Sequence, residues 1–259
     1  MHVMWMSVTE TMNSCGGKLT DVCPKVKCKY RSCGKKKDYY EVTSRENQAL
    51  NSIFQQKWRW FYELEIGDPS RNVIEKIFRA ASTNPSTQHR TIKKVLRVNN
   101  TVDISEKFEK YRGAVKRRSF GQHPRSTVDG NELLQFYVTT MTCCYGKRKI
   151  ISDLCKDPSC CVCKLIQTGF RNSCNSENGI QLSTSSDAPC EHASRVSNTK
   201  NVKRAVIVCR TIAGRVVNKD DMKLDQEYDS VASGLHSRSQ YLIVKDSDAV
   251  LPCFIIVLN

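Results

Sequence analysis

Four cysteines in the middle of this sequence have a spacing that could hold a metal ion. They follow the pattern Cys-x11-Cys-x4-Cys-x2-Cys and are Cys143, Cys155, Cys160 and Cys163. A two-residue gap, as between the last pair, lets one turn present two thiolates to a tetrahedral zinc ion. Their neighbours Cys144 and Cys161 could substitute for them. We therefore predict a structural zinc that orders this loop. The alternative is a group of small buried thiols.

A second cysteine set lies near the N-terminus, in a segment rich in lysine. Its members are Cys15, Cys23, Cys28 and Cys33. If this set also held zinc, Tyr30 could stack on a base while the lysines contact phosphates. The alternative is a basic disordered tail. We expect residues 1–47 to form a basic, cysteine-containing N-terminal segment that is either flexible or organised by metal.

Other reactive arrangements do not emerge from the sequence. The five histidines show no paired spacing, and no Ser-His-Asp or Cys-His arrangement can be argued. No Cys-x2-4-Cys pair is followed by His-x3-5-His, so an ordinary DNA-reading zinc finger is excluded.

The overall composition is that of a globular protein with a basic first half. The chain has 259 residues, a net charge of +15 and 39% hydrophobic residues. Residues 68–127 hold 14 lysines or arginines against 5 acids, a net of +9. This balance favours anionic partners, including nucleic acid, although a solvated helix face would also explain it.

The sequence shows neither a signal peptide nor an apolar run long enough to cross a bilayer. We therefore expect an intracellular protein, nuclear or cytoplasmic, without membrane association. In that setting its 14 cysteines would serve as thiols or metal ligands instead of forming disulfides.

Hydrophobic periodicity outlines the elements that would position these residues. Asp68 and Pro69 form a helix start, and the helix should end before Asn84 and Pro85. Alternation predicts a strand over 92–98, and helical spacing predicts a basic amphipathic helix over 104–115. Further strands are expected at 133–140, 205–208, 241–244 and 253–258, a strand or short helix at 58–66, and loops at 123–130 and 142–163. This mixture indicates an α+β fold.

Six segments, in order, resemble the catalytic domain of poly(ADP-ribose) polymerases. They are 92–112, 131–140, the glycine pairs at 169–170 and 179–180, 204–216, 228–231 and 239–257. More narrowly, 67–78 and 123–134 resemble a plant family labelled as C2H2 or C2HC zinc-finger-like. The resemblance implies an ADP-ribosyltransferase-like domain over residues 48–259. Such a domain has a split antiparallel sheet with flanking helices.

The same resemblance implies that the catalytic groups of the family are replaced here. Tyr137 stands at the His position, Val138 at the adjoining Gly and Gln240 at the Glu, while Gln181 follows Gly179 and Ile180 where the family has Tyr. The implied NAD⁺-contacting set is Tyr137, Val138, Thr139, Gly179, Gln181 and Gln240. Since Gln240 cannot offset the positive charge that develops on the ribose, NAD⁺ turnover is not expected.

We therefore predict a non-catalytic binding or regulatory protein with a protein partner and, at most, weak NAD⁺ affinity. One alternative is an NAD-dependent mono-ADP-ribosyltransferase that uses Asp187 or Glu191. A second alternative is a nucleic-acid-binding zinc protein that works through residues 18–37 and the helix around Lys107 to Arg118.

Overall fold

The computed structural model describes residues 59–83, 91–121, 123–143, 153–172, 179–188, 202–221, 227–233 and 240–259. All of them belong to one compact unit, Arg59–Asn259. The predicted N-terminal segment 1–47, with the second cysteine set, lies outside these residues, as do Cys144 and Glu191. Within the described part of the chain, no helix is long and apolar enough to span a membrane.

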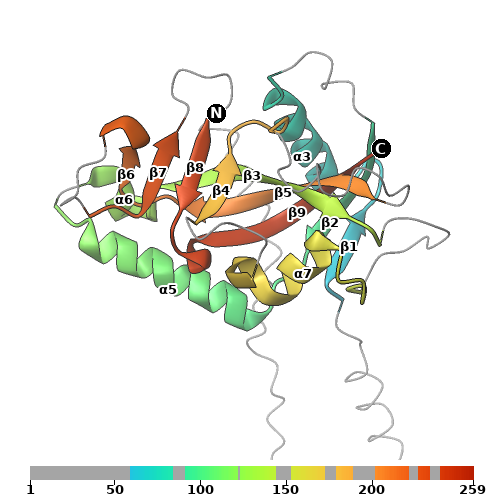
Figure 1. The fold of residues 1–259 in the computed structure, drawn as a ribbon, viewed down its shortest axis with the longest axis horizontal. Helices are drawn as coiled ribbons and strands as arrows, with labels where there is room; N and C mark the ends of the chain where they lie inside the picture. Colours follow the sequence, from blue (N-terminus) through green and yellow to red (C-terminus); the bar gives the residue numbers. More distant parts are fainter. Residues whose placement is uncertain are drawn as a thin grey trace, which may run out of the picture. The chain divides into compact units, whose positions relative to one another are not determined.

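A nine-stranded mixed sheet dominates this unit, in the order β1-β2-β9-β5-β3-β4-β8-β7-β6 (Figure 1). Every neighbouring pair is antiparallel except β6 and β7, which are parallel and so depart from the predicted antiparallel sheet. The strands are β1 Phe61–Leu64, β2 Ile92–Val98, β3 Glu132–Met141, β4 Ile180–Ser183, β5 Lys203–Ile212, β6 Val216–Asn218, β7 Ser230–Ser233, β8 Tyr241–Val244 and β9 Val250–Leu258.

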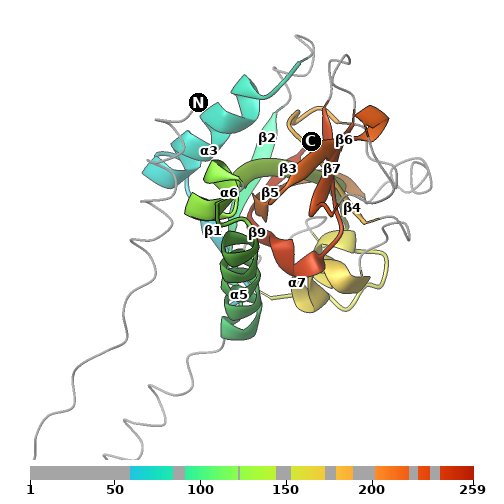
Figure 2. The ribbon, with the colours of Figure 1, turned by 90° about the vertical axis from the view of Figure 1, so that its left-hand side faces the viewer.

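The sheet is nearly divided between β3 and β4. These strands pair at a single position, Phe136 with Ser183, whereas β3 and β5 pair along their whole length. One part is therefore β1-β2-β9-β5-β3 and the other is β4-β8-β7-β6. In Figures 1 and 2, helix α3 lies above the sheet, whereas α5 and α7 lie below it. The α+β class is thus confirmed.

The helices begin and end largely where local chemistry predicts. Helix α3, Pro69–Ala80, starts at Asp68, whose side chain accepts hydrogen bonds from the backbone N–H groups of Ser70 (2.7 Å) and Arg71 (3.2 Å). Helix α5, Val102–Arg118, covers the predicted basic helix and is capped by Thr101. These caps satisfy amides that have no partner in the first helical turn.

Two loop predictions were wrong. Residues 123–130 contain helix α6, Pro124–Asp129, which ends at Gly130 in the left-handed conformation (φ 78°). The predicted loop 142–163 contains the start of helix α7, Cys161–Thr168, which continues into the 3-10 turn η1, Gly169–Asn172. Both helices are too short for a periodic apolar pattern to show in the sequence.

The central strands form the core. Every residue of β9 is buried, and Val206, Ile207 and Val208 of β5 are fully shielded from solvent. Continuous apolar runs of this kind are expected for strands covered on both faces.

An ion cluster is buried beside this core. The carboxylate of Glu132, with 6% of its side chain exposed, is bound by Arg112 of α5 and by Arg210 of β5 (Nε–Oε1 2.6 Å). Phe108 lies close to both guanidinium groups, at 5.0 and 5.3 Å from its ring centroid.

Candidate metal centre

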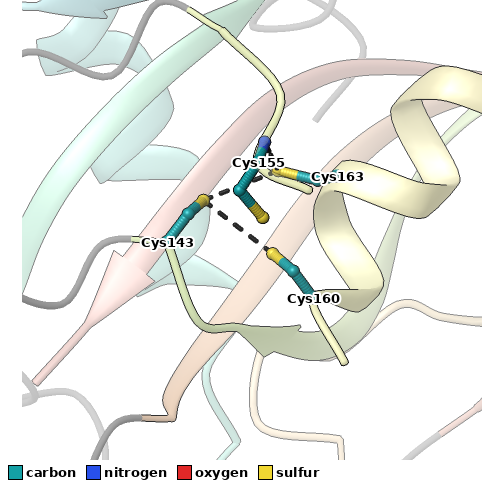
Figure 3. A group of neighbouring side chains, drawn as sticks. All are labelled: Cys143, Cys155, Cys160 and Cys163. Atoms are coloured by element: carbon teal, nitrogen blue, oxygen red, sulfur yellow. Dashed lines mark hydrogen bonds between the residues drawn. The ribbon is translucent and has the colours of Figure 1, made fainter. Parts of the chain in front are cut away.

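The four cysteines of the predicted zinc set come together at the end of β3 (Figure 3). Their sulfur atoms all lie within 4.8 Å of one another. The Sγ atom of Cys143 is 3.5 Å from that of Cys163 and 3.8 Å from that of Cys160. The backbone N–H of Cys155 donates to Cys163 Sγ at 3.4 Å. The structure therefore confirms the grouping that the spacing predicted, as a cluster that could bind a metal such as zinc.

Each ligand is positioned by a different local feature. Cys143 follows the last residue of β3 by two positions, Cys160 is the N-cap of α7, and Cys163 lies in the first helical turn. The gap of two residues places the last two sulfur atoms on the same side of that turn. Cys160 and Cys163 are buried, whereas Cys143 and Cys155 are half-buried, so the centre faces solvent on one side.

A tight turn between Cys155 and Cys160 sets their separation. The carboxylate of Asp157 accepts hydrogen bonds from the Ser159 hydroxyl (2.6 Å), the Ser159 N–H (2.9 Å) and the Thr142 hydroxyl (2.9 Å). These bonds hold the pKa of Asp157 below its usual value. Because Thr142 adjoins Cys143, Asp157 ties the two halves of the cluster together. No sequence motif assigns a role to Asp157, and only its position between Cys155 and Cys160 points to it.

The dimensions fit a zinc ion with four thiolate ligands. Zn–S bonds of about 2.3 Å in a tetrahedron place sulfur atoms about 3.8 Å apart. Two of the sulfur–sulfur separations, 3.5 and 3.8 Å, agree with that edge length and exceed the roughly 2.05 Å of a disulfide, and all four sulfur atoms lie within 4.8 Å of one another. Hydrogen bonds with the sulfur atoms of Cys143 and Cys163 lower the pKa of the Cys160 thiol, whereas the pKa of the Cys163 thiol is raised, in part by its hydrogen bond with Cys160 and by burial.

Cys161 lies outside the cluster. Its sulfur atom is directed to the backbone carbonyl of Ser159, at 3.8 Å, and it is not among the residues grouped around the candidate metal position. Successive residues of a helix point about 100° apart, so Cys161 cannot share the direction of Cys160. The predicted substitution of Cys161 for a ligand therefore does not occur in this arrangement.

The cluster fastens α7 at one end, and an aromatic contact fastens it at the other. Val162, Leu165 and Ile166 of α7 are at most 2% exposed. Beyond the helix, the ring of Phe170 meets the ring of Tyr137 edge-on, with centroids 5.3 Å apart and planes at 87°. Segment 153–170 thus covers part of β3 through the cysteine cluster, an apolar helix face and Phe170.

The sequence matches no family model, and no curated protein matches it either.

The residues implied to contact NAD⁺ lie near one another in the sheet but are not all accessible. Phe136 pairs with Ser183, and Ser183 pairs with Tyr241, so β4 alone separates Tyr137 of β3 from β8, which Gln240 immediately precedes. That separation is about 10 Å across the sheet. Gln240 is exposed, whereas Tyr137 is 6% exposed.

Among the neighbouring positions, Thr139 is buried, whereas Val138, Gly179 and Gln181 are half-buried. Thr139 is fully buried, and its hydroxyl has no hydrogen-bond partner in the described part of the structure. Gly179 has φ 110°, and a Cβ atom there would come within 2.7 Å of the Val244 carbonyl oxygen. Gln181 pairs with Ile243 in the β4–β8 ladder. These positions pack the sheet.

Asp187, the acid nominated for an alternative transferase, is engaged in a structural contact. Its carboxylate accepts hydrogen bonds from the Ser82 hydroxyl (2.5 Å) and the Thr83 N–H (2.8 Å), just beyond the end of α3. It therefore links the segment after β4 to α3.

A small cleft opens elsewhere, between α5 and the α7–η1 segment. Its volume is about 170 Å³, and Ile104, Lys107, Ile166, Phe170 and Pro252 are among the residues that line it. The cleft shares Phe170 with the cover over Tyr137, so its shape depends on how α7 is held.

Proposed function

We propose that this chain is a non-catalytic, ADP-ribosyltransferase-like binding protein whose domain is stabilised by a structural zinc ion. The observation that carries the proposal is the placement of α7 by contacts at both of its ends. The cluster of four thiols lies at its N-terminal end, and Phe170, just beyond its C-terminal end, packs on Tyr137. Zinc would be held by Cys143, Cys155, Cys160 and Cys163. With four thiolates it would be fully coordinated, and such a closed site serves structure, whereas a catalytic zinc keeps a position for water.

Several features support the absence of turnover. The phenol that stands in the place of the family's histidine is buried under Phe170. Gln240 is neutral, so it would not stabilise a cationic ribose in the transition state. Asp187, the described candidate for a replacement anion, already accepts two hydrogen bonds from the end of α3. A domain with this frame and these substitutions is suited to binding a partner, which we propose to be another protein in the nucleus or cytoplasm.

Metal analysis of purified full-length protein tests the zinc centre. We expect Cys160→Ser to contain one zinc per chain less than the unchanged protein, whatever the N-terminal cysteines bind. Cys161→Ser is the matched control, because Cys161 neighbours the same helix start but lies outside the cluster. Equal zinc contents in all three proteins would refute a metal centre at this position.

Incubation with labelled NAD⁺ tests the lack of activity. We expect neither automodification nor NAD⁺ hydrolysis at high protein concentration. Label transfer that disappears in Tyr137→Phe or Gln240→Ala would instead identify an active transferase and overturn the non-catalytic part of the proposal, while leaving the zinc measurement unaffected.

A further inference from the structure

A basic stripe with an exposed aromatic end runs along α5. Lys110, Gly113, Arg117 and Phe120 follow one another at intervals of three, four and three residues, so they share one side of the helix and its end. The position of a Cβ atom added to Gly113 would be 3.4 Å from Arg117 Nη1, which places the guanidinium group along the helix surface. Together with Lys116, we call Lys110, Arg117 and Phe120 the α5 stripe.

The stripe carries positive charge that the described domain does not neutralise. From Lys110 to Val128 the sequence has six lysines or arginines and no acid. Three of the arginines are paired: Arg112 with Glu132, Arg118 with Asp229, and Arg125 with Asp129. Lys110, Lys116 and Arg117 form no ion pair with a described residue.

Phe120 is the feature that helix stability does not explain. Cations in the last turn of a helix interact favourably with its dipole, which accounts for Lys116 and Arg117 in structural terms. Phe120, however, is 79% exposed just beyond that turn, and Val128 of α6 is 72% exposed. The Thr127 hydroxyl donates to the Ser119 carbonyl at 2.9 Å, so α6 is tied to the end of α5 beside Phe120.

We infer that the α5 stripe binds single-stranded nucleic acid. Cations without an ion-pair partner among the described residues, on a helix that ends near an exposed aromatic ring, match a strand whose phosphates are anionic and whose bases can stack on that ring. An anionic membrane surface is the other partner to consider. The core-facing side chains of α5, Phe108 and Val115, are at most 1% exposed, so the helix offers no continuous apolar face for insertion.

Fluorescence anisotropy of full-length protein with a labelled 20-nucleotide oligouridylate tests this inference across a salt series. For single strands, the slope of log affinity against log salt changes by about 0.7 per phosphate contact. We therefore expect the triple variant Lys110→Ala, Lys116→Ala, Arg117→Ala to reduce the slope by about 2. We expect Phe120→Ala to weaken binding by about 5- to 150-fold, while Phe120→Trp retains it.

Matched controls separate this surface from the general positive charge, including that of the N-terminal segment. The triple variant Lys76→Ala, Lys93→Ala, Lys219→Ala removes the same charge from exposed positions on other elements and should keep the slope. Tyr62→Ala removes a partly exposed aromatic ring from β1 and should leave the affinity unchanged. Equal losses in both triple variants would overturn the inference. So would the absence of binding at low salt, or binding to phosphatidylserine vesicles without binding to the oligonucleotide.

Discussion

Replacing Cys160 with serine removes a sulfur atom from the candidate metal centre at the position just before the first residue of α7. Cys160 is fully buried, so the cluster cannot recruit a water molecule from bulk solvent at that position without local opening. We expect zinc to be lost and segment 153–170 to separate from β3, since Val162, Leu165 and Ile166 would lose the anchor at their end of the helix.

The size of the expected loss of stability follows from the thermodynamic linkage between zinc binding and folding. A ligand present at 1,000 times its dissociation constant stabilises the folded state by about 4 kcal/mol. In a domain of about 200 residues, each kcal/mol shifts the melting temperature by about 2–4 °C. We therefore expect Cys160→Ser to melt about 8–16 °C lower than the unchanged protein when both are measured at a zinc concentration that saturates the unchanged centre.

Thermal denaturation with and without a chelator measures the decrease in melting temperature. Hydrogen exchange shows which segment of the domain opens. The chelator should lower the melting temperature of the unchanged protein and of Cys161→Ser, but hardly that of Cys160→Ser, which has no zinc to lose at this centre. Exchange should rise first in α7 and η1. A melting temperature of Cys160→Ser within 2 °C of that of Cys161→Ser would refute the reasoning.

Three further changes probe the rest of the domain. Phe170→Ala should destabilise the domain by about 3–5 kcal/mol because it leaves a cavity over Tyr137. Urea unfolding measures this change in the free energy of unfolding, and a loss under about 1 kcal/mol would mean that the contact is dispensable. Glu132→Gln should lower the free energy of unfolding by about 3–5 kcal/mol because two arginines lose a buried anion. The control Glu109→Gln, at an exposed position, should lower it by less than about 1 kcal/mol. Similar losses in the two variants would contradict a buried ion cluster. Burial raises the pKa of the Cys253 thiol to about 12, above about 8.5 in the unfolded chain, so its stabilising effect is present below pH 8.5 and declines as the pH rises towards 12. Between pH 8.5 and 10 the unchanged protein should therefore lose about 2 kcal/mol more than Cys253→Ala, and parallel pH curves would refute that assignment.

Local sequence signals accounted for the elements with strong patterns. Asp68 before Pro69 marked the start of α3, and alternation and apolar runs marked β2 and β9. The short α6 and α7 escaped notice because a helix of two turns or fewer carries too few residues to show a period. The cysteine spacing nevertheless identified all four members of the candidate metal centre, since a gap of two residues is itself a geometric requirement.

Packing between residues far apart in the sequence decided which side chains are buried and which charged groups pair. The sequence places Tyr137 where the resemblance implies a ligand-facing side chain, but the tertiary structure buries it under Phe170, which lies 33 residues further along the chain. Likewise, Glu132 meets Arg112 and Arg210 only because β3, β5 and α5 pack together. The spacing of residues along the chain thus determined the possible ligands, caps and strands, because these depend on near neighbours. Which side chains are covered depends on residues that approach one another only in the folded state. The tertiary structure alone therefore decided the burial of Tyr137 and the pairing of Glu132 with two arginines.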